Sequence, residues 1–469
     1  MRVCMILEGS YPYINGGVSS WMHNYIKASP DIEYVLWVIG AHEKDKGRFK
    51  YELADNVLEV HEVFLDSAIK MAPAGKKVRL TVEEKEAVSA LIDCARPDWG
   101  VLVSMFQDKK MNPLDVLMSE DFLDTMTALC MEKYPYVAYA ETFHTMRSML
   151  LPVLYLLSME VPAADMYHTV CTGYGGLLAV LAAYQTARPV MLTEHGIYSR
   201  EREEEIIRAT WVIPAFKKQW ISFFYMLSDA IYKKAARITS LFNNARKTQI
   251  ELGAPREVTR VVANGIFYDR FSSIPLKEED GIVDIGAVIR LAPIKDVKTL
   301  IYAFYELTRR VPNVRLHILG GTDDEEYAQE CYNLAENYGL KNCIFAGQVN
   351  VIEYMEKLDF TVLSSISEGQ PLSVLESFAA RRPVVTTEVG CCRDLIEGGE
   401  GDKLGKAGYL VPPMHREALA EAMERMCSSF ARRLRMGEVG QKRVRTYYIH
   451  ESMMKNYMSI YKEIEEECL

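Results

Sequence analysis

The feature that most constrains the fold is a repeated alternation of short apolar segments with longer amphipathic ones. In the second half of the chain, helical periodicity is expected near Val297–Arg310, Glu325–Tyr338, Val351–Lys357 and Pro371–Arg381. The apolar segments between and after them are Val283–Ile289, Val314–Leu319, Cys343–Ala346, Phe360–Leu363, Pro383–Thr386 and Tyr409–Val411. Strands that alternate with helices pair in parallel, so the pattern predicts an α/β fold.

The first half shows the same pattern with one interruption. Its expected strands are Val3–Leu7, Tyr34–Ile39, Tyr167–Val170, Val190–Thr193, Arg237–Ser240 and Thr259–Val262. From about residue 65 to residue 162 the periodicity is helical instead, over Val82–Cys94, Pro113–Cys130 and Val137–Leu157. We interpret this block as a helical insertion in the first domain that offers a binding surface.

The length of 469 residues exceeds what one hydrophobic core usually supports. We therefore expect two doubly wound, Rossmann-like domains facing a cleft, since ligands bind at the carboxyl ends of parallel strands. The N-terminal domain is expected over residues 1–268 and the C-terminal domain over residues 281–445, with the polar segment Phe271–Asp280 as linker. Residues 446–469 are expected to form a helix that packs back on the first domain.

Composition narrows the class of protein. A net charge of −10 without a strongly basic run argues against a nucleic-acid partner. The ten cysteines lack the paired spacings of a zinc site or a disulfide scaffold, which favours free thiols in a reducing cytosol. The most apolar stretch, Met149–Leu157, is far shorter than the roughly 20 residues of a membrane span, and the first residues resemble a strand rather than a signal peptide. We expect a soluble, cytoplasmic protein.

Residues 368–376, with the sequence E-G-Q-P-L-S-V-L-E, carry most of the functional information. Pro371 suits the first position of a helix, and Glu376 lies on the apolar stripe of that helix, where an unpaired carboxylate is costly. Glu376 should therefore bind polar partners such as the hydroxyls of a sugar. Glu368 lies just before the helix, whose free N–H groups favour a phosphate. These features indicate a nucleotide-sugar site, completed by Gly369, Gln370, Pro371 and Leu372.

Two cations follow the expected strand Val283–Ile289 at its carboxyl end. Arg290 offers a planar fork and Lys295 a point charge, a complementary pair for the two phosphates of a nucleotide diphosphate. They would hold the diphosphate and stabilise the charge that builds on it as the sugar leaves. The alternative is that both are solvated loop charges, but Glu368 downstream favours the phosphate role.

Three residues of the first half are candidates for the same site. Gly16 and Gly17 precede an expected helix near Val18, where glycine lets the backbone approach a phosphate closely. His195 follows the strand Val190–Thr193, where a neutral imidazole can donate to a sugar hydroxyl or oppose developing positive charge. The structural alternatives are an ordinary glycine loop and a histidine that caps a turn.

Other motifs favour structural roles. Asp323-Asp324 precedes an expected helix and is interpreted as its N-cap rather than a divalent-metal site, so no metal is expected. Asn264-Gly265 is a strong turn pair. Cys391-Cys392 are interpreted as small packing residues. The segment Gly173–Gly176 has the wrong spacing for a dinucleotide fingerprint and is expected to begin a βα turn.

Several of these motifs resemble those of the retaining GT-B glycosyltransferases of the sucrose-synthase and glycogen-synthase-like group. The motifs are Arg290 with Lys295, Phe345-Ala-Gly-Gln348, and the 368–376 stretch followed by Pro383-Val-Val. The resemblance spans essentially the whole chain and is strongest in the second half. It implies that the first glutamate and residues 369–372 contact the donor sugar, and that Glu376 binds the ribose. The two cations then bind the diphosphate, and the N-terminal glycine pair borders it.

A closer resemblance is to the PelF family, cytosolic glycosyltransferases of Pel exopolysaccharide synthesis in biofilms. It rests on the segments Glu8–Trp21 and Glu194–Glu203 and on the helical insertion. It implies a UDP-sugar donor, either UDP-glucose or an N-acetylhexosamine relative, and membrane-embedded synthase subunits as partners at the inner face of the membrane. The family more often has glycine where this chain has Cys391-Cys392, which leaves the identity of the sugar open.

The expected activity is metal-independent transfer of a hexose or N-acetylhexosamine, with retention, from a UDP-sugar to a growing exopolysaccharide or related glycan. His195, Arg290, Lys295 and Glu368 are the expected catalytic residues. The main alternative is a non-catalytic nucleotide-sugar-binding subunit of a polysaccharide synthase. A phosphorylase or epimerase on the same fold ranks lower, because no motif for a lysine-bound pyridoxal phosphate is evident.

Overall fold

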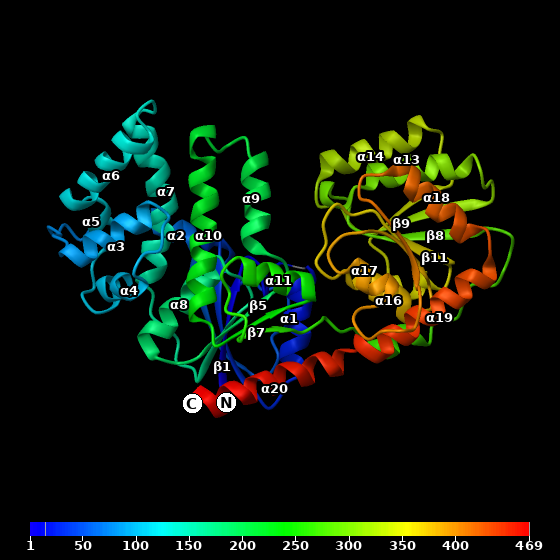
Figure 1. Cartoon of the computed structure of the whole chain (residues 1–469), viewed down its shortest axis with the longest axis horizontal. Helices are drawn as coiled ribbons and strands as arrows, with labels where there is room; N and C mark the ends of the chain where they lie inside the picture. The colour runs from blue at the N-terminus through cyan, green and yellow to red at the C-terminus, as the bar shows by residue number, and fades with distance from the viewer. Residues whose placement is uncertain (15, 469) are drawn as a thin grey trace. The chain divides into compact units, whose positions relative to one another are not determined.

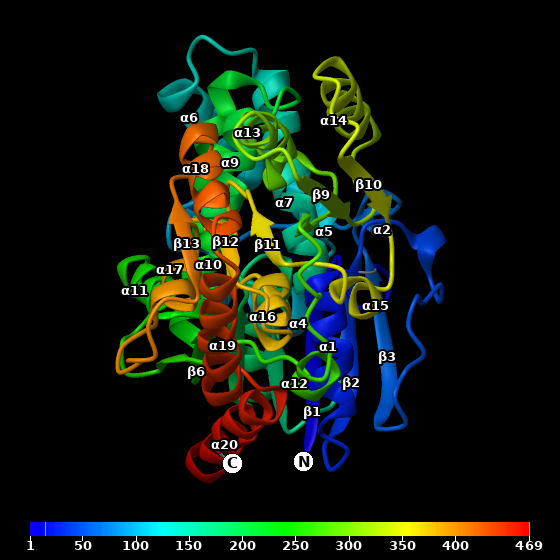
Figure 2. The same cartoon turned by 90° about the vertical axis from the view of Figure 1, so that its right-hand side faces the viewer.

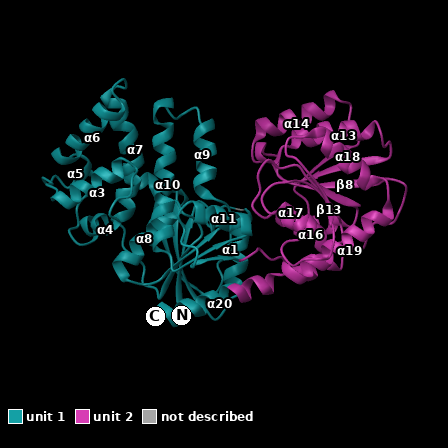
Figure 3. Cartoon of the chain, viewed as in Figure 1, with its two compact units in different colours: residues 1–261, 457–469 teal, residues 262–456 magenta. Residues whose placement is uncertain are grey.

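A computed structural model describes residues 1–14 and 16–468. Asn15, within the predicted Glu8–Trp21 motif, and Leu469, at the end of the predicted last helix, lie outside the described residues. The chain divides into unit 1, residues 1–261 with 457–469, and unit 2, residues 262–456 (Figure 3). Each unit is built around one parallel sheet with helices, so the expected fold class is confirmed.

Unit 1 contains a seven-stranded sheet with the order β3-β2-β1-β4-β5-β6-β7. Its strands are β1 (Arg2–Glu8), β2 (Glu33–Gly40), β3 (Val57–Phe64), β4 (Met166–Thr169), β5 (Val190–Glu194), β6 (Arg237–Ser240) and β7 (Thr259–Val261). Strand β3 was not predicted, because as an edge strand it carries charged, exposed positions in place of an apolar run. The order reverses between β1 and β4, which is the switch point of the sheet.

Alternate residues of β1 face two different layers of unit 1. Cys4 and Ile6 belong to the buried cluster that includes helices α8 (Tyr174–Thr186) and α10 (Lys217–Lys234). On the other face, the sulfur of Met5 accepts a hydrogen bond from Tyr461 of α20 (His450–Cys468). Figure 1 shows α8 and α1 (Gly17–Lys27) on opposite sides of this sheet. Unit 1 is therefore doubly wound.

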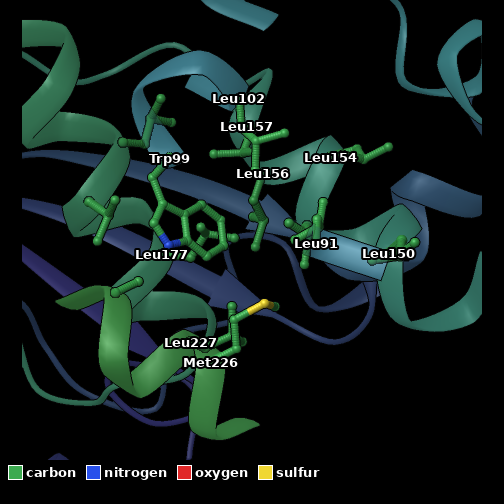
Figure 4. Close-up of a cluster of buried hydrophobic side chains, with 14 of the residues drawn as sticks. Leu91, Trp99, Leu102, Leu150, Leu154, Leu156, Leu157, Leu177, Met226 and Leu227 are labelled. Carbon is green, nitrogen blue, oxygen red and sulfur yellow. The ribbon is translucent and has the colours of Figure 1, made fainter. Parts of the chain in front are cut away.

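The predicted insertion lies between β3 and β4 and forms helices throughout. They are α2 (Leu65–Ile69), α3 (Val82–Ile92), α4 (Trp99–Gln107), α5 (Pro113–Leu117), α6 (Glu120–Lys133) and α7 (Tyr139–Leu157). The single helix predicted over Pro113–Cys130 is two, because the Ser119 hydroxyl accepts from the Phe122 N–H and caps a new start. Side chains of α3, α4 and α7 pack with α8 and α10 in one cluster around Trp99 (Figure 4). The insertion therefore shares the core of unit 1.

Unit 2 contains a six-stranded parallel sheet with the order β10-β9-β8-β11-β12-β13 (Figure 2). Its strands are β8 (Val283–Val288), β9 (Val314–Leu319), β10 (Cys343–Gly347), β11 (Phe360–Leu363), β12 (Val384–Thr387) and β13 (Gly408–Val411). All six were predicted. The order reverses between β8 and β11, so the loops after these two strands flank the switch point where α/β sheets bind ligands.

The helices of unit 2 follow the expected alternation. They are α12 (Tyr268–Ser272), α13 (Val297–Thr308), α14 (Glu325–Asn337), α15 (Val351–Met355), α16 (Leu372–Ala379), α17 (Cys392–Glu397), α18 (Arg416–Cys427) and α19 (Phe430–Tyr447). Unit 1 also contains α9 (Tyr198–Arg208) and α11 (Asn243–Glu251). Among the described residues, every helix is too short or too polar to span a membrane.

Residues 262–268, expected to end the first domain, belong to unit 2. The Ile266 N–H donates to the Tyr448 carbonyl at 2.9 Å, and the His450 N–H donates to the Ile266 carbonyl at 2.9 Å. A Cβ at Gly265 would lie 2.4 Å from the Ile449 oxygen, so the Asn264-Gly265 pair allows a close backbone approach and is more than a turn. These hydrogen bonds join the first residues of unit 2 to its last residues.

Helix α20 begins in unit 2, and its residues from Tyr457 onward belong to unit 1. There the hydroxyl of Tyr461 lies 2.7 Å from Nδ1 of the buried His168, and His168 Nε2 lies 2.8 Å from the Thr193 hydroxyl. Arg237 of β6 also donates to both carboxylate oxygens of Glu467 at 2.7 Å. These contacts anchor the last turns of α20 to the unit 1 sheet.

Candidate functional site

The loops after β8 and β11 bring two of the predicted site residues together. Lys295 ends a short 3-10 turn that follows β8, and Glu368 lies in the loop between β11 and α16. Lys295 Nζ donates to Glu368 Oε1 at 2.6 Å. The two side chains are 18% and 13% exposed, so the pair is largely shielded from water but still open to a ligand. A cation and a carboxylate thus meet at the switch point of unit 2.

Two serines that the sequence analysis missed support this pair. The Ser365 hydroxyl donates to Glu368 Oε1 at 2.6 Å, and the Ser364 hydroxyl donates to the Lys295 carbonyl at 2.8 Å. Within residues 1–14 and 16–468, no group donates to the second carboxylate oxygen of Glu368. That oxygen is therefore available to a hydroxyl of a ligand. The signal for the serines was their place directly after β11, at the same sheet edge as Lys295.

Arg290 lies at the same edge but is not paired with Lys295. Its guanidinium forms an ion pair with Asp323, and the two side chains are 56% and 39% exposed. Asp323 therefore does not share the N-cap role predicted for it. Asp324 alone caps α14, since its carboxylate accepts from the Tyr327 N–H at 3.0 Å. Exposed ion pairs are weak, so a phosphate can replace Asp323 on Arg290 at little cost.

The start of α16 differs from the prediction in two details. Pro371 occupies the N-cap position, and Leu372 is the first helical residue. No described side chain caps this N-terminus, so its first N–H groups keep their capacity for an anion. The side chain of Gln370 is already used, because its Oε1 accepts from the Asn264 N–H at 2.7 Å. Gln370 can therefore offer a ligand only its backbone, like Gly369.

A glycine after β12 fixes the position of Glu368. Gly390 has a φ of +52°, and a Cβ there would lie 2.2 Å from the carbonyl oxygens of both Glu368 and Gly369. The next residue, Cys391, donates its N–H to the Gly369 carbonyl at 3.0 Å. Cys391 and Cys392 are both buried, which confirms their prediction as packing residues. The loop after β12 thus supports the loop that carries the carboxylate.

Glu376 lies on the first turns of α16, and its carboxylate is partly buried. None of the described side chains or backbone groups forms a hydrogen bond or an ion pair with it. Burial raises the pKa of Glu376 to about 7. Hydroxyl donors from a ligand would favour its ionised form, as predicted for a carboxylate that binds a sugar.

The candidates in unit 1 lie on two of its elements. Helix α1 begins at Gly17, and among the described residues no side chain caps it and nothing lies within 4 Å of a Cβ at Gly16 or Gly17. His195 follows β5, with its ring 4.5 Å from that of Trp21, and its buried Nε2 has no hydrogen-bond partner among the residues that the structure describes. Burial lowers the pKa of His195 to about 4, so the imidazole is neutral near pH 7.

Glu8 is a further candidate in unit 1, which the sequence analysis quoted only within a longer motif. It ends β1 at the switch point of its sheet. Its Oε2 accepts from the Gly175 N–H at 2.9 Å, in the first turn of α8, and from the Cys171 thiol at 3.3 Å. Its Oε1 accepts from the Tyr198 hydroxyl at 3.4 Å. The donors come from distant parts of the sequence, so no local sequence motif predicts this cluster. Gly173–Gly176 begins a βα turn here, as predicted.

No metal centre is evident in the part of the chain that the structure describes. Nowhere in it do three His, Cys, Asp or Glu side chains gather closely enough to hold an ion. The positive groups at the edge of the unit 2 sheet are Lys295, Arg290 and the N–H groups of α16. These groups suit the binding of a diphosphate.

Comparison with known families agrees with this geometry. Residues 1–257 match the family described as "Domain of unknown function (DUF3492)", and residues 272–443 match "Glycosyl transferases group 1". The first match covers more than half of the chain, so the chain belongs to that family, and its second unit carries the group 1 glycosyltransferase domain. The protein is a glycosyltransferase with the GT-B fold.

Individual proteins show the same relationship. The chain is 23% identical over 320 residues to alpha-monoglucosyldiacylglycerol synthase of Streptococcus pneumoniae, covering 62% of this chain and 68% of the relative. It is 22% identical over 309 residues to the capsular polysaccharide biosynthesis glycosyltransferase CapM of Staphylococcus aureus, covering 63% and 76%.

Two solved structures share the fold over nearly the whole chain. HepE of Anabaena, in complex with UDP, has a TM-score of 0.63 at 14% identity and covers 99% of this chain and 100% of that one. Sucrose-phosphate synthase of Thermosynechococcus elongatus has a TM-score of 0.62 at 15% identity and covers 99% of both chains. At this identity the likeness concerns the fold alone.

Proposed function

We propose that this protein transfers a hexose or an N-acetylhexosamine from a UDP-sugar, with retention, to the glycan of a growing exopolysaccharide. The Lys295–Glu368 pair at the switch point of unit 2 is the observation that carries the proposal. The unpartnered carboxylate of Glu376, on the helix that follows, supports it. HepE was solved with UDP, and CapM is named for capsular polysaccharide biosynthesis, which favours the same donor and product class.

In this proposal the donor binds along the carboxyl edge of the unit 2 sheet. The diphosphate contacts Lys295, Arg290 and the first N–H groups of α16. An ammonium has three donors, so Lys295 can hold a phosphate oxygen while it keeps Glu368. The second oxygen of Glu368 accepts from a hydroxyl of the sugar, and Glu376 accepts from the ribose hydroxyls.

The proposed reaction breaks the bond between the anomeric carbon and the phosphate oxygen and forms a bond to an acceptor hydroxyl on the same face. The acceptor proton passes to the leaving phosphate oxygen, so no further base is required. Negative charge grows on the diphosphate as the bond breaks. Lys295 and the α16 N-terminus stabilise that charge, without a metal in this proposal.

The residues of unit 1 have proposed roles at the sugar and the acceptor. His195, a neutral imidazole without a hydrogen-bond partner on Nε2, would donate to or accept from a sugar hydroxyl. Gly16 and Gly17 would let the diphosphate approach the α1 backbone. As in the PelF family, the chain would work on the cytoplasmic side beside membrane-embedded synthase subunits.

The proposal is tested by incubating the protein with a panel of UDP-, GDP- and ADP-sugars, with and without glycan acceptors. We expect UDP release that depends on both a UDP-sugar and an acceptor, and an α-linked product from an α-linked donor in the NMR spectrum. If the protein binds a UDP-sugar tightly but releases no UDP with any acceptor, the result would instead indicate a non-catalytic nucleotide-sugar-binding subunit. A product of inverted configuration would contradict retention.

A further inference from the structure

Unit 2 has a cavity lined by arginines at the other end of helix α16 from the proposed donor site. Its volume is about 720 Å³, which lies within the range of small-molecule sites. It is lined by residues of α12, of the loop after α16, of the end of α19 and of the start of α20. Helices α12, α16 and α19 contact one another, as Figure 2 shows. Three guanidinium groups line it: Arg270, Arg381 and Arg445.

The cavity and the donor site lie at opposite edges of the same sheet. Arg381 follows the last turn of α16 and precedes β12, so it lies at the amino ends of the parallel strands. Glu368 and Lys295 follow β11 and β8, at the carboxyl ends. Helix α16 connects the two edges. The cavity is therefore a separate site from the one proposed for the donor sugar.

The three arginines lack carboxylate partners in the described part of the chain. None of them forms an ion pair there, although two acidic residues, Asp269 and Glu451, also line the cavity. Arg270 instead lies over the Phe267 ring, with its Cζ 4.4 Å from the ring centroid. By contrast, the nearby Arg443 is fully paired with Asp402. Three unpaired guanidiniums around one cavity leave it with a net positive charge.

Arg381 is held in a conformation that its residue type disfavours. Its φ is +60°, in the left-handed region, at the position after α16 where glycine is usually preferred. Its backbone is fixed there, because the next residue's N–H donates to the Ser377 carbonyl at 2.8 Å, and α19 approaches it through Gly437. The Nε of Arg381 is buried and has no hydrogen-bond partner. A strained backbone at an arginine whose guanidinium lines a cavity points to a role for the side chain there.

We propose that this cavity binds a phosphate group, held by the forked donors of Arg270, Arg381 and Arg445. Guanidinium groups match the geometry of phosphate oxygens in two parallel hydrogen bonds, and the three of them outweigh the two carboxylates of the lining by one charge. The hydroxyl of Ser272 and the amide of Gln441 also line the cavity. Gln441 already donates to the Ala379 carbonyl at 2.9 Å, which ties the cavity wall to the end of α16.

The phosphate has two conceivable sources, a soluble phosphate compound or the headgroup of an anionic lipid, and one experiment separates them. Inorganic pyrophosphate is titrated by calorimetry into protein saturated with UDP, so that the donor site does not contribute, and the titration is repeated with Lys295→Ala. In parallel, the protein is sedimented with phosphatidylglycerol vesicles and with phosphatidylcholine vesicles. Binding of pyrophosphate indicates the soluble source, and binding only to phosphatidylglycerol vesicles indicates the lipid.

Three variants show whether the cavity is responsible. Arg381→Gly removes the guanidinium and relaxes the left-handed backbone, so it should fold at least as well as the parent while weakening phosphate binding at least tenfold. Arg445→Gln should have a similar effect. Arg435→Gln removes an exposed charge from the same helix, α19, outside the cavity and should change binding less than twofold. The proposal is overturned if neither probe binds, or if Arg381→Gly and Arg445→Gln bind as the parent does.

Discussion

Unit 1 and unit 2 have the same strand order around their switch points, and unit 1 adds β7 at one edge. In each unit a glutamate lies at this point, Glu8 at the end of β1 and Glu368 after β11. Glu8 accepts from a backbone N–H, a thiol and a phenol, all of them neutral. Glu368 accepts from an ammonium and a hydroxyl. The same topology thus holds a carboxylate in two different electrostatic settings.

The difference extends to the loops around each glutamate. The first seven residues after β1 and after β4, the two strands at the switch point of unit 1, contain no lysine or arginine. In unit 2, Arg290 and Lys295 both follow β8. Binding of a diphosphate requires cations or free N–H groups, whereas the neutral hydroxyl groups of a ligand require only hydrogen-bond acceptors and donors. The comparison therefore assigns the cationic side chains that hold the diphosphate to unit 2, whereas the switch-point side chains of unit 1 suit hydroxyl groups, and four variants test this division.

The largest effect is expected for Lys295→Ala, which removes the ammonium at the switch point of unit 2. By analogy with lost oxyanion donors, kcat should fall by about 2–4 kcal/mol of transition-state stabilisation, roughly 30- to 1,000-fold. The measurement is the rate of UDP release at saturating donor. Lys298→Ala is the matched control, since Lys298 lies one turn further on and is already paired with Glu330. Near-normal turnover by Lys295→Ala would refute the assignment of the diphosphate to this residue.

The second effect concerns Glu376, whose ionisation is opposed by burial. Because its pKa is raised from 4.5 to about 7, folding favours the protonated carboxyl, and its contribution to stability is lost as the pH rises through this range. Glu376→Gln should therefore raise the free energy of unfolding at pH 8 by on the order of 1–3 kcal/mol and leave it unchanged near pH 4. Denaturant unfolding at both pH values measures this difference.

The same variant should bind UDP more weakly, by about tenfold, because charged hydrogen bonds to the ribose are lost. For the parent protein, UDP affinity should rise between pH 6 and pH 8 as Glu376 ionises, and the variant should lose this dependence. Glu336→Gln, at an exposed position of α14, should change neither property. If Glu376→Gln is more stable but binds UDP as the parent does, the assignment of Glu376 to the UDP site is contradicted.

The strands of unit 2 were predictable because each one is a buried apolar run with helical periodicity on both sides. Lys295 and Glu368 were assigned to one site from their chemistry, and the strand order that places them side by side was shown only by the fold. Strand β3 was missed because its exposed charges hide the pattern. Helix α4 was missed because its sequence, WGVLVSMFQ, is apolar on nearly every side and shows no polar face.

The partners of the site residues were less predictable than their positions. Asp323 forms an ion pair with Arg290 and does not cap α14, a choice that depends on the course of the loop after β9. Gln370 uses its side chain on the Asn264 backbone, which lies more than a hundred residues earlier. Such contacts depend on loop conformation, and no local periodicity encodes them. Local pattern therefore predicted where the chemistry lies, and only the fold showed which groups are already paired.

A smaller effect is expected for Gly390→Ala, which tests whether the loop after β12 positions Glu368. The added Cβ would overlap the carbonyls of residues 368 and 369, and alanine is strained at a φ of +52°. The free energy of unfolding should fall by about 1–3 kcal/mol, and UDP affinity should fall with it. Gly281→Ala is the control, because it has a φ of +80° but no atom within 4 Å of the added Cβ. Equal stability losses and unchanged UDP binding in both variants would contradict the positioning role.

The smallest effect is expected for Glu8→Gln, which keeps the shape of the switch-point residue in unit 1 but removes its charge. The carboxylate lies at the N-terminus of α8, so its loss should reduce the free energy of unfolding by about 0.5–1 kcal/mol. If the Glu8 side chain binds only neutral hydroxyl groups, UDP affinity should stay within twofold of the parent, while the KM for a glycan acceptor rises. Thermal unfolding, UDP calorimetry and acceptor kinetics measure the three quantities.

Glu33→Gln is the control for this last variant, since Glu33 is exposed at the start of β2, away from the switch point. It should leave stability and both ligands unaffected. A tenfold loss of UDP affinity in Glu8→Gln would mean that the unit 1 glutamate senses the diphosphate. Because Glu8 has only neutral donors around it, such a result would break the division of ligands between the two sheets.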